Sequence, residues 1–186
     1  MENRNHKDSL FIDLFCKDKE GKQNFISLYN ALHNTNLDLA TTTVQEVNIE
    51  NVLYMALSND IAMLVDNRLV VLVEHQSTIN ENMPLRLLEY VSRIYEQLVP
   101  SEDRYEKKMI KIPYPEFFVF YNGTDDYPVE TELRLSDAFI FPEEKYNVKS
   151  SDLTIEIKVK IININSDKQS PILKQCKKLE EYSLLI

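Results

Sequence analysis

Two carboxylates and one amide, on Asp60, Glu74 and Gln76, are the groups in this chain best placed by type and spacing to do chemistry. Asp60 precedes one apolar run, and Glu74 and Gln76 close the next. If the two runs pair as antiparallel strands, Asp60 and Glu74 meet at one rim of a sheet. Side chains alternate along a strand, so residues 74 and 76 are expected to point the same way. Carboxylate and amide oxygens suit a hard cation.

The hairpin that would position these groups is predicted from the runs Ile61 to Val65 and Leu69 to Val73, which Asp66-Asn67 separates. Continuous aliphatic and β-branched runs are typical of strands buried on both faces. Asp and Asn tolerate left-handed backbone angles, so this dipeptide predicts a turn. We therefore interpret Asp66 as a turn residue rather than a catalytic one.

Helices and further strands are expected on either side of the hairpin. Pro84 suits a first helical turn and Pro100 ends a helix, so a helix is predicted from Pro84 to about Val99. Other helices are predicted over residues 7–18 and 23–34, with Gly21 between them, and from about Pro171 onward. Strands are predicted near residues 43–47, over 116–121 and, half-exposed, over 154–164, whereas residues 124–151 are predicted to be irregular.

This order of elements predicts the fold class. A hairpin followed by a crossover helix and another strand indicates an α/β domain, with a mixed sheet flanked by helices. We expect a single domain over residues 1–186, with N-terminal helices in 1–36 and the core in 54–164.

Composition restricts the function. The formal net charge is −9, which weighs against tight nucleic-acid binding because phosphate contacts supply most of that affinity. A bound divalent cation would change the local field, so this objection is partial. The chain contains two glycines, Gly21 and Gly123, which excludes a glycine-rich phosphate loop.

The sequence predicts a cytoplasmic protein. The N-terminus lacks an apolar stretch typical of a signal peptide, and no apolar run approaches the roughly 20 residues of a membrane span. Cys16 and Cys176 are far apart in the sequence, and we expect two buried thiols rather than a disulfide.

Several segments resemble a known family. The segment from Asn59 to Gln76 resembles the core of PD-(D/E)XK nucleases, in which an Asp opens one strand and Glu-x-Lys closes the next. Longer blocks resemble the recombination-promoting nuclease and transposase-like branch of that superfamily, at residues 74–86, 90–95, 112–123 and 133–139. The resemblance runs from about Tyr54 to Ile186 and implies a restriction-endonuclease-like core. Members of this branch tend to continue past the equivalent of Ile186, which favours a fragment of a longer protein.

The resemblance implies a metal-dependent DNA endonuclease linked to recombination or transposition. Asp60 and Glu74, with the backbone carbonyl of His75, would bind Mg²⁺ or Mn²⁺. Gln76 stands where Lys is usual in the superfamily, although Gln is common in this branch. An amide has no titratable proton, so Gln76 can orient water but cannot act as a base. Glu46 or Glu50 is a further candidate ligand.

The predicted helix after the hairpin carries the candidate contacts to double-stranded DNA. Arg86, Tyr90 and Arg93 recur on one helical face and are our candidates for phosphate contact. Alternatively, the two arginines pair with Glu89 and Glu96 on the helix surface.

An alternative function is a catalytically weak or inactive module of the same fold that acts by homodimerisation or protein binding. The acidic charge and the missing Lys favour it, whereas the intact set of Asp60, Glu74 and Gln76 favours the enzyme. The side chain of His75 is expected in a core or an interface.

Overall fold

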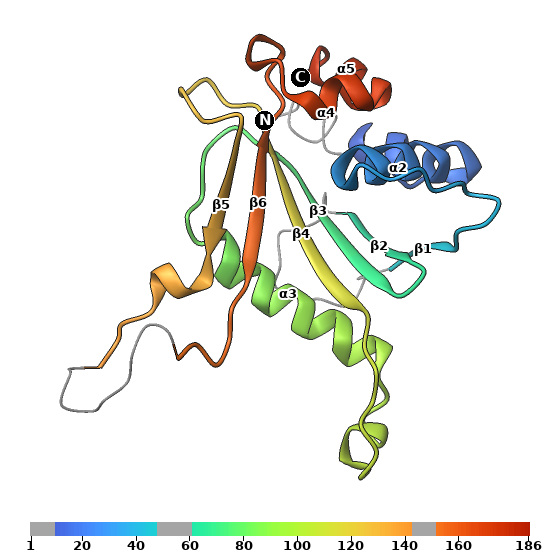
Figure 1. The fold of residues 1–186 in the computed structure, drawn as a ribbon, viewed down its shortest axis with the longest axis vertical. Helices are drawn as coiled ribbons and strands as arrows, with labels where there is room; N and C mark the ends of the chain where they lie inside the picture. Colours follow the sequence, from blue (N-terminus) through green and yellow to red (C-terminus); the bar gives the residue numbers. More distant parts are fainter. Residues whose placement is uncertain (1–9, 48–60, 143–151) are drawn as a thin grey trace.

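A six-stranded mixed sheet forms the centre of the protein (Figure 1). The computed structural model describes residues 10–47, 61–142 and 152–186, and of residues 71–76 it describes the backbone alone. The strand order is β1-β2-β3-β4-β6-β5, in which β3, β4 and β6 are parallel and the other pairings are antiparallel. The strands are β1 (Val44–Glu46), β2 (Ile61–Val65), β3 (Arg68–Gln76), β4 (Tyr114–Tyr121), β5 (Glu130–Arg134) and β6 (Lys158–Asn163).

Helices cover both faces of this sheet. One face packs against α3 and the other against the N-terminal and C-terminal helices (Figure 1). The helices are residues 10–15, α2 (Asp18–His33), α3 (Met83–Leu98), α4 (Pro171–Gln175) and α5 (Lys177–Ser183). Short 3-10 turns are η1 (Asp103–Tyr105), η2 (Leu135–Ala138) and η4 (Ser166–Lys168). This architecture confirms the predicted α/β class and is that of a restriction-endonuclease-like core. In the described part of the chain, no helix is long and apolar enough to cross a membrane.

The apolar run in β4 is continuous because both of its faces are buried. Phe117 and Val119 lie in the cluster beneath α3, whereas Phe118 and Phe120 lie in the cluster beneath α2, α4 and α5. The prediction of a strand covered on both faces is therefore confirmed.

The hairpin is confirmed with its predicted turn. Ile61 pairs with Leu72 and Val65 with Arg68, which leaves Asp66 and Asn67 as the loop. Asp66 has φ 52°, and its Oδ1 accepts a hydrogen bond from the Thr43 backbone N–H at 3.0 Å. Asp66 thus forms the turn and holds β1 against the hairpin.

The helix after the hairpin also begins and ends close to the predicted residues. Pro84 lies in the first turn of α3, and the extended backbone of Val99 ends the helix just before Pro100. The Arg104 guanidinium donates hydrogen bonds to the Val99 and Glu96 carbonyls, which have no partner within the helix.

The boundary between the first two helices differs from the prediction. Gly21 lies within α2, and the chain turns at Cys16 and Lys17 instead. Asp18, at φ 59°, accepts hydrogen bonds from the N–H groups of Glu20 at 2.7 Å and Gly21 at 3.3 Å, and so caps the new helix. A Cβ at Gly21 would lie 2.9 Å from the Cys16 carbonyl carbon. Gly21 therefore permits the tight approach of the two helices rather than ending either one.

Two predictions about the C-terminal strands were wrong. Residues 124–151 are not wholly irregular, because β5 forms within them and pairs with β6 at the sheet edge. The predicted half-exposed strand 154–164 is the shorter β6, and it lies between β4 and β5 with Val159, Ile161 and Ile162 buried. Local alternation could not reveal these neighbours, because both pairings join segments distant in sequence.

The C-terminal helix is two helices that meet at Cys176. Cys16 and Cys176 are both buried free thiols, as predicted. Burial raises the pKa of the Cys16 thiol to about 12 and also raises that of Cys176. Neither thiol is therefore poised as a nucleophile at neutral pH.

Candidate functional site

The carboxyl ends of the three parallel strands lie together at one edge of the sheet. Gln76, Tyr121 and Asn163 occupy neighbouring positions there, because Gln76 pairs with Tyr121 and Tyr121 with Asn163. Ligands of open α/β sheets bind beyond this edge. The sequence motif Glu74-His75-Gln76 ends β3 at the same place, so this edge is the candidate site.

The backbone of β3 is irregular at the motif. Val73 pairs with Val119 and Gln76 with Tyr121, so three steps along β3 match two along β4. Such a bulge adds one residue and commonly re-aims side chains beside active sites. The bulge interrupts the simple alternation from which residues 74 and 76 were expected to share a face.

Most of the predicted catalytic groups lie outside what the structure describes. These are Asp60, Glu50 and the side chains of Glu74, His75 and Gln76. The pairing of Ile61 with Leu72 does bring the first described residue of β2 beside the middle of β3, two residues before Glu74. The predicted convergence of Asp60 and Glu74 at this rim stays a prediction. Among the described residues, no group of three or more His, Cys, Asp or Glu could hold a metal ion.

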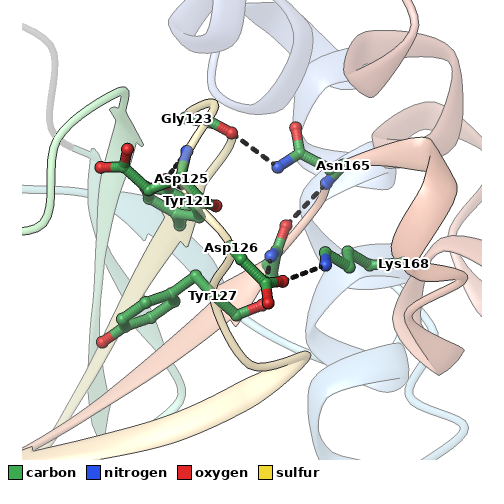
Figure 2. A network of polar contacts seen from close by, with 8 residues as sticks. Tyr121, Gly123, Asp125, Asp126, Tyr127, Asn165 and Lys168 are labelled. Atoms are coloured by element: carbon green, nitrogen blue, oxygen red, sulfur yellow. Dashed lines mark hydrogen bonds and ion pairs between the residues drawn. The ribbon is translucent and has the colours of Figure 1, made fainter.

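A polar network holds the loop that follows β4 against the end of β6 (Figure 2). The side chain of Asn163 is fully buried, and its Nδ2 donates to the Tyr127 carbonyl at 3.0 Å. Its Oδ1 accepts the N–H of Asn165 at 3.0 Å, and the Asn165 amide donates to the Gly123 carbonyl at 2.9 Å. One buried amide therefore ties the loop to the sheet edge.

The same loop reaches the residue that follows the motif. A Cβ on Gly123 would lie 2.3 Å from the Ser77 carbonyl oxygen and 2.4 Å from Tyr121 Oη. Only glycine allows this close approach. Tyr121 Oη also accepts the Asp125 N–H at 3.1 Å, so the strand end and the loop hold each other in place.

Sequence reasoning missed Asn163 and Lys168 as parts of this edge. A polar Asn inside the apolar run Ile161 to Ile164 was an available signal, because a buried amide needs partners. Lys168 offered none, because its ion pair with Asp126 joins residues 42 apart in the sequence.

The predicted DNA-contact residues on α3 do not form one exposed row. Arg93 is exposed and pairs with Glu96 at 2.9 Å, as the alternative reading expected. Arg86 is half-buried and approaches the Met83 sulfur at 3.3 Å. Tyr90 is 1% exposed and lies in the core beneath α3, so this structure gives its side chain no path to a phosphate. The 3.6-residue period places Tyr90 on the side of Leu87 and Val91, which turn toward the sheet.

The other candidate acids and histidines are distributed as follows. Glu46 lies on the edge strand β1, where its side chain is exposed. His6 lies outside the described residues. His33, for which no metal-ligating neighbours were expected, is the last residue of α2, and its Nε2 lies 3.5 Å from Glu116 Oε2.

The pair of His33 and Glu116 is mostly buried, with 18% and 14% of their side chains exposed. Within the described residues neither His33 Nε2 nor Glu116 Oε2 has a hydrogen-bond partner. Burial raises the pKa of Glu116, and the nearby Arg68 opposes that rise. Burial lowers the pKa of His33, as do the charges of Arg68 and Lys160. Burial therefore disfavours the charged form of both side chains.

Glu116→Gln should become increasingly stable relative to wild type as the pH rises. A folded-state pKa above the ordinary 4.5 means that Glu116 contributes stability below that pH, which is lost as the pH rises through the folded-state pKa. Gln does not titrate, so the variant escapes this loss. Urea denaturation from about pH 4 to about pH 8 measures the difference in unfolding free energy. Glu180→Gln, on the exposed surface of α5, is the control. A difference between Glu116→Gln and wild type that stays flat or shrinks with pH contradicts the expectation.

The mixed sheet, its covering helices and the bulged central strand define a restriction-endonuclease-like α/β protein. The family model described as "Putative transposase, YhgA-like" matches residues 5–170. The chain therefore belongs to this family, the recombination-promoting nuclease family of PD-(D/E)XK type, and the resemblance seen in the sequence is confirmed. Searches of curated proteins and of solved structures gave no significant match.

Proposed function

We propose that the chain is a metal-dependent endonuclease that hydrolyses phosphodiester bonds of double-stranded DNA in recombination or transposition. The supporting observation is the position of the Glu74-x-Gln76 motif. It ends the central strand β3, at a register shift, beside the carboxyl ends of β4 and β6. Membership of the YhgA-like transposase family agrees with DNA as the substrate.

The donors proposed for this edge fit Mg²⁺ or Mn²⁺. Asp60, Glu74 and the His75 carbonyl are oxygen donors, which these cations prefer. Asn122, directly after Tyr121, adds a buried amide oxygen that has no hydrogen-bond partner among the described residues. When bound, the ion would stabilise charge on the phosphate and lower the pKa of a bound water.

The chain's own groups would then position the reactants. Gln76 would orient the attacking water through its amide but take no proton from it, because an amide does not titrate near neutral pH. Arg86 and Arg93 are the proposed phosphate contacts from α3. To bind a phosphate, Arg93 would have to break its ion pair with Glu96. An exposed ion pair contributes little, so this exchange costs little.

The second candidate function is a nuclease-fold module that binds a protein or a second copy of itself without cutting DNA. The net charge of −9 and the replacement of Lys by Gln76 favour this function. Neither observation is specific to a partner.

A plasmid-nicking assay separates the two functions. The full chain should convert supercoiled plasmid to the nicked form with Mg²⁺ or Mn²⁺. Excess EDTA should stop the reaction, because it removes the ion that would lower the pKa of the attacking water. Product is measured on agarose gels over time. Failure to nick with either ion, by a preparation shown to be folded, would support the binding module.

A further inference from the structure

Lys168 lies beside the carboxyl ends of the parallel strands, where DNA is proposed to bind. It forms an ion pair with an aspartate that a DNA phosphate could displace. The residue ends η4, a few residues beyond β6, and its Nζ donates to Asp126 Oδ1 at 2.6 Å. Asp126 belongs to the loop after β4 (Figure 2). Gly123 of the same loop lies against the Ser77 carbonyl oxygen. Tyr121, the partner of Gln76 in the sheet, also interacts electrostatically with Lys168. Lys168 is thus a cation close to the end of the motif strand.

The ion pair is asymmetric in its exposure. The Asp126 side chain is 95% exposed, whereas that of Lys168 is 27% exposed. The lysine is therefore mostly covered by the surrounding protein, while the carboxylate projects into solvent. An exposed carboxylate contributes little net free energy to such a pair, because water solvates it almost as well. A DNA phosphate can present the same kind of oxygen acceptor to Lys168 and releases counterions on binding.

The loop itself does not need the Asp126 carboxylate to stay in place. Asn165 holds the Gly123 carbonyl, Asn163 holds the Tyr127 carbonyl, and the Asn163 N–H donates to the Val129 carbonyl at 2.9 Å. These contacts fix the loop on both sides of residue 126. Loss of the ion pair should therefore free the Lys168 ammonium without moving the loop.

We propose that Lys168 is a phosphate contact for DNA at the carboxyl end of β6, and that Asp126 competes with DNA for it. This inference rests on the proposed function, since it supplies that site with an additional DNA contact. In a chain of net charge −9, the competing acid would restrain binding until a phosphate takes its place.

The chain offers a matched control. Asp125 is the neighbouring exposed acid of the same loop, and Figure 2 shows its carboxylate pointing away from Lys168. Asp125→Asn and Asp126→Asn remove the same charge from adjacent positions, but only the second releases Lys168. A difference between the two variants therefore isolates the ion pair from the general repulsion of DNA by acids.

The test measures binding of a fluorescein-labelled DNA duplex to the full chain by anisotropy, with Ca²⁺ in place of Mg²⁺, across about 50 to 200 mM salt. Lys168→Met should weaken DNA binding about threefold. It should also reduce the slope of log affinity against log salt by about 0.9, the value for one lost phosphate contact. Asp126→Asn should strengthen binding by a similar factor, and more than Asp125→Asn does. The double variant should behave as Lys168→Met does.

Whether Asp126→Asn and Lys168→Met change DNA affinity in opposite directions decides whether the inference holds. A purely structural ion pair predicts that Asp126→Asn and Lys168→Met weaken binding alike, and that result would overturn the inference. Equal strengthening by Asp125→Asn and Asp126→Asn would also overturn it, because charge alone would then suffice. A wild-type chain that nicks plasmid yet gives either result keeps the proposed function and loses only this inference. A wild-type chain that neither binds nor nicks DNA overturns both.

Discussion

Asp60→Asn is expected to slow metal-dependent nicking of plasmid DNA about a thousandfold or more, as the loss of several kcal/mol of transition-state stabilisation requires. The substitution keeps the size of the side chain and removes its charge. In the proposed site this charge would help to hold the cation. Gln76 could not replace the lost metal site, because its amide does not titrate and cannot act as a base. Initial nicking rates at saturating Mg²⁺ and at saturating Mn²⁺ measure the effect.

Three further variants test whether the loss in Asp60→Asn comes from the metal site. Glu74→Gln should cause a similar loss, and the double variant should lose little more, because groups that hold one ion act as a unit. Glu180→Gln removes an exposed carboxylate on α5 that is not among the proposed ligands, and it should nick as wild type does. Equal nicking by Asp60→Asn and wild type would show that Asp60 is not a metal ligand, and would therefore contradict the proposed ligand set.

Phe120→Ala is expected to cost about 3–5 kcal/mol of unfolding free energy, as large-to-small changes in well-packed cores do. The Phe120 side chain is fully buried, and its ring lies 5.8 Å, edge on, from that of Phe11. Phe11 in turn contacts Tyr182 of α5, with ring centroids 5.3 Å apart. Phe120 therefore links β4, through Phe11, to helices from both ends of the chain. Chemical denaturation followed by far-ultraviolet circular dichroism measures the loss.

Tyr105→Ala is the control, since that aromatic side chain is 90% exposed in η1. It should change the unfolding free energy by less than about 0.5 kcal/mol, as exposed substitutions usually do. A loss below about 1 kcal/mol for Phe120→Ala would mean that the N-terminal and C-terminal helices do not pack on β4 as described.

Local patterns in the sequence determined the elements whose signals are local. The hairpin followed from two apolar runs and the turn residue Asp66, and the limits of α3 followed from Pro84 and Pro100. A left-handed turn and a proline-bounded helix depend on backbone preferences of a few adjacent residues, so the chain itself contains the information. The motif that resembles the nuclease family was likewise readable without coordinates, and the family match bears it out.

Tertiary structure decided what depends on distant partners. β5 is a strand because β6 supplies its hydrogen bonds, and β6 is interior because β4 and β5 flank it. Tyr90 is a core residue because α3 turns that side toward the sheet. The bulge at residues 73–76 and the link from Asn163 through Asn165 to Gly123 arise where three strand ends meet. A local pattern can indicate that a residue is buried, but it does not specify the partner from a distant segment, and for that reason only the folded chain reveals these pairings.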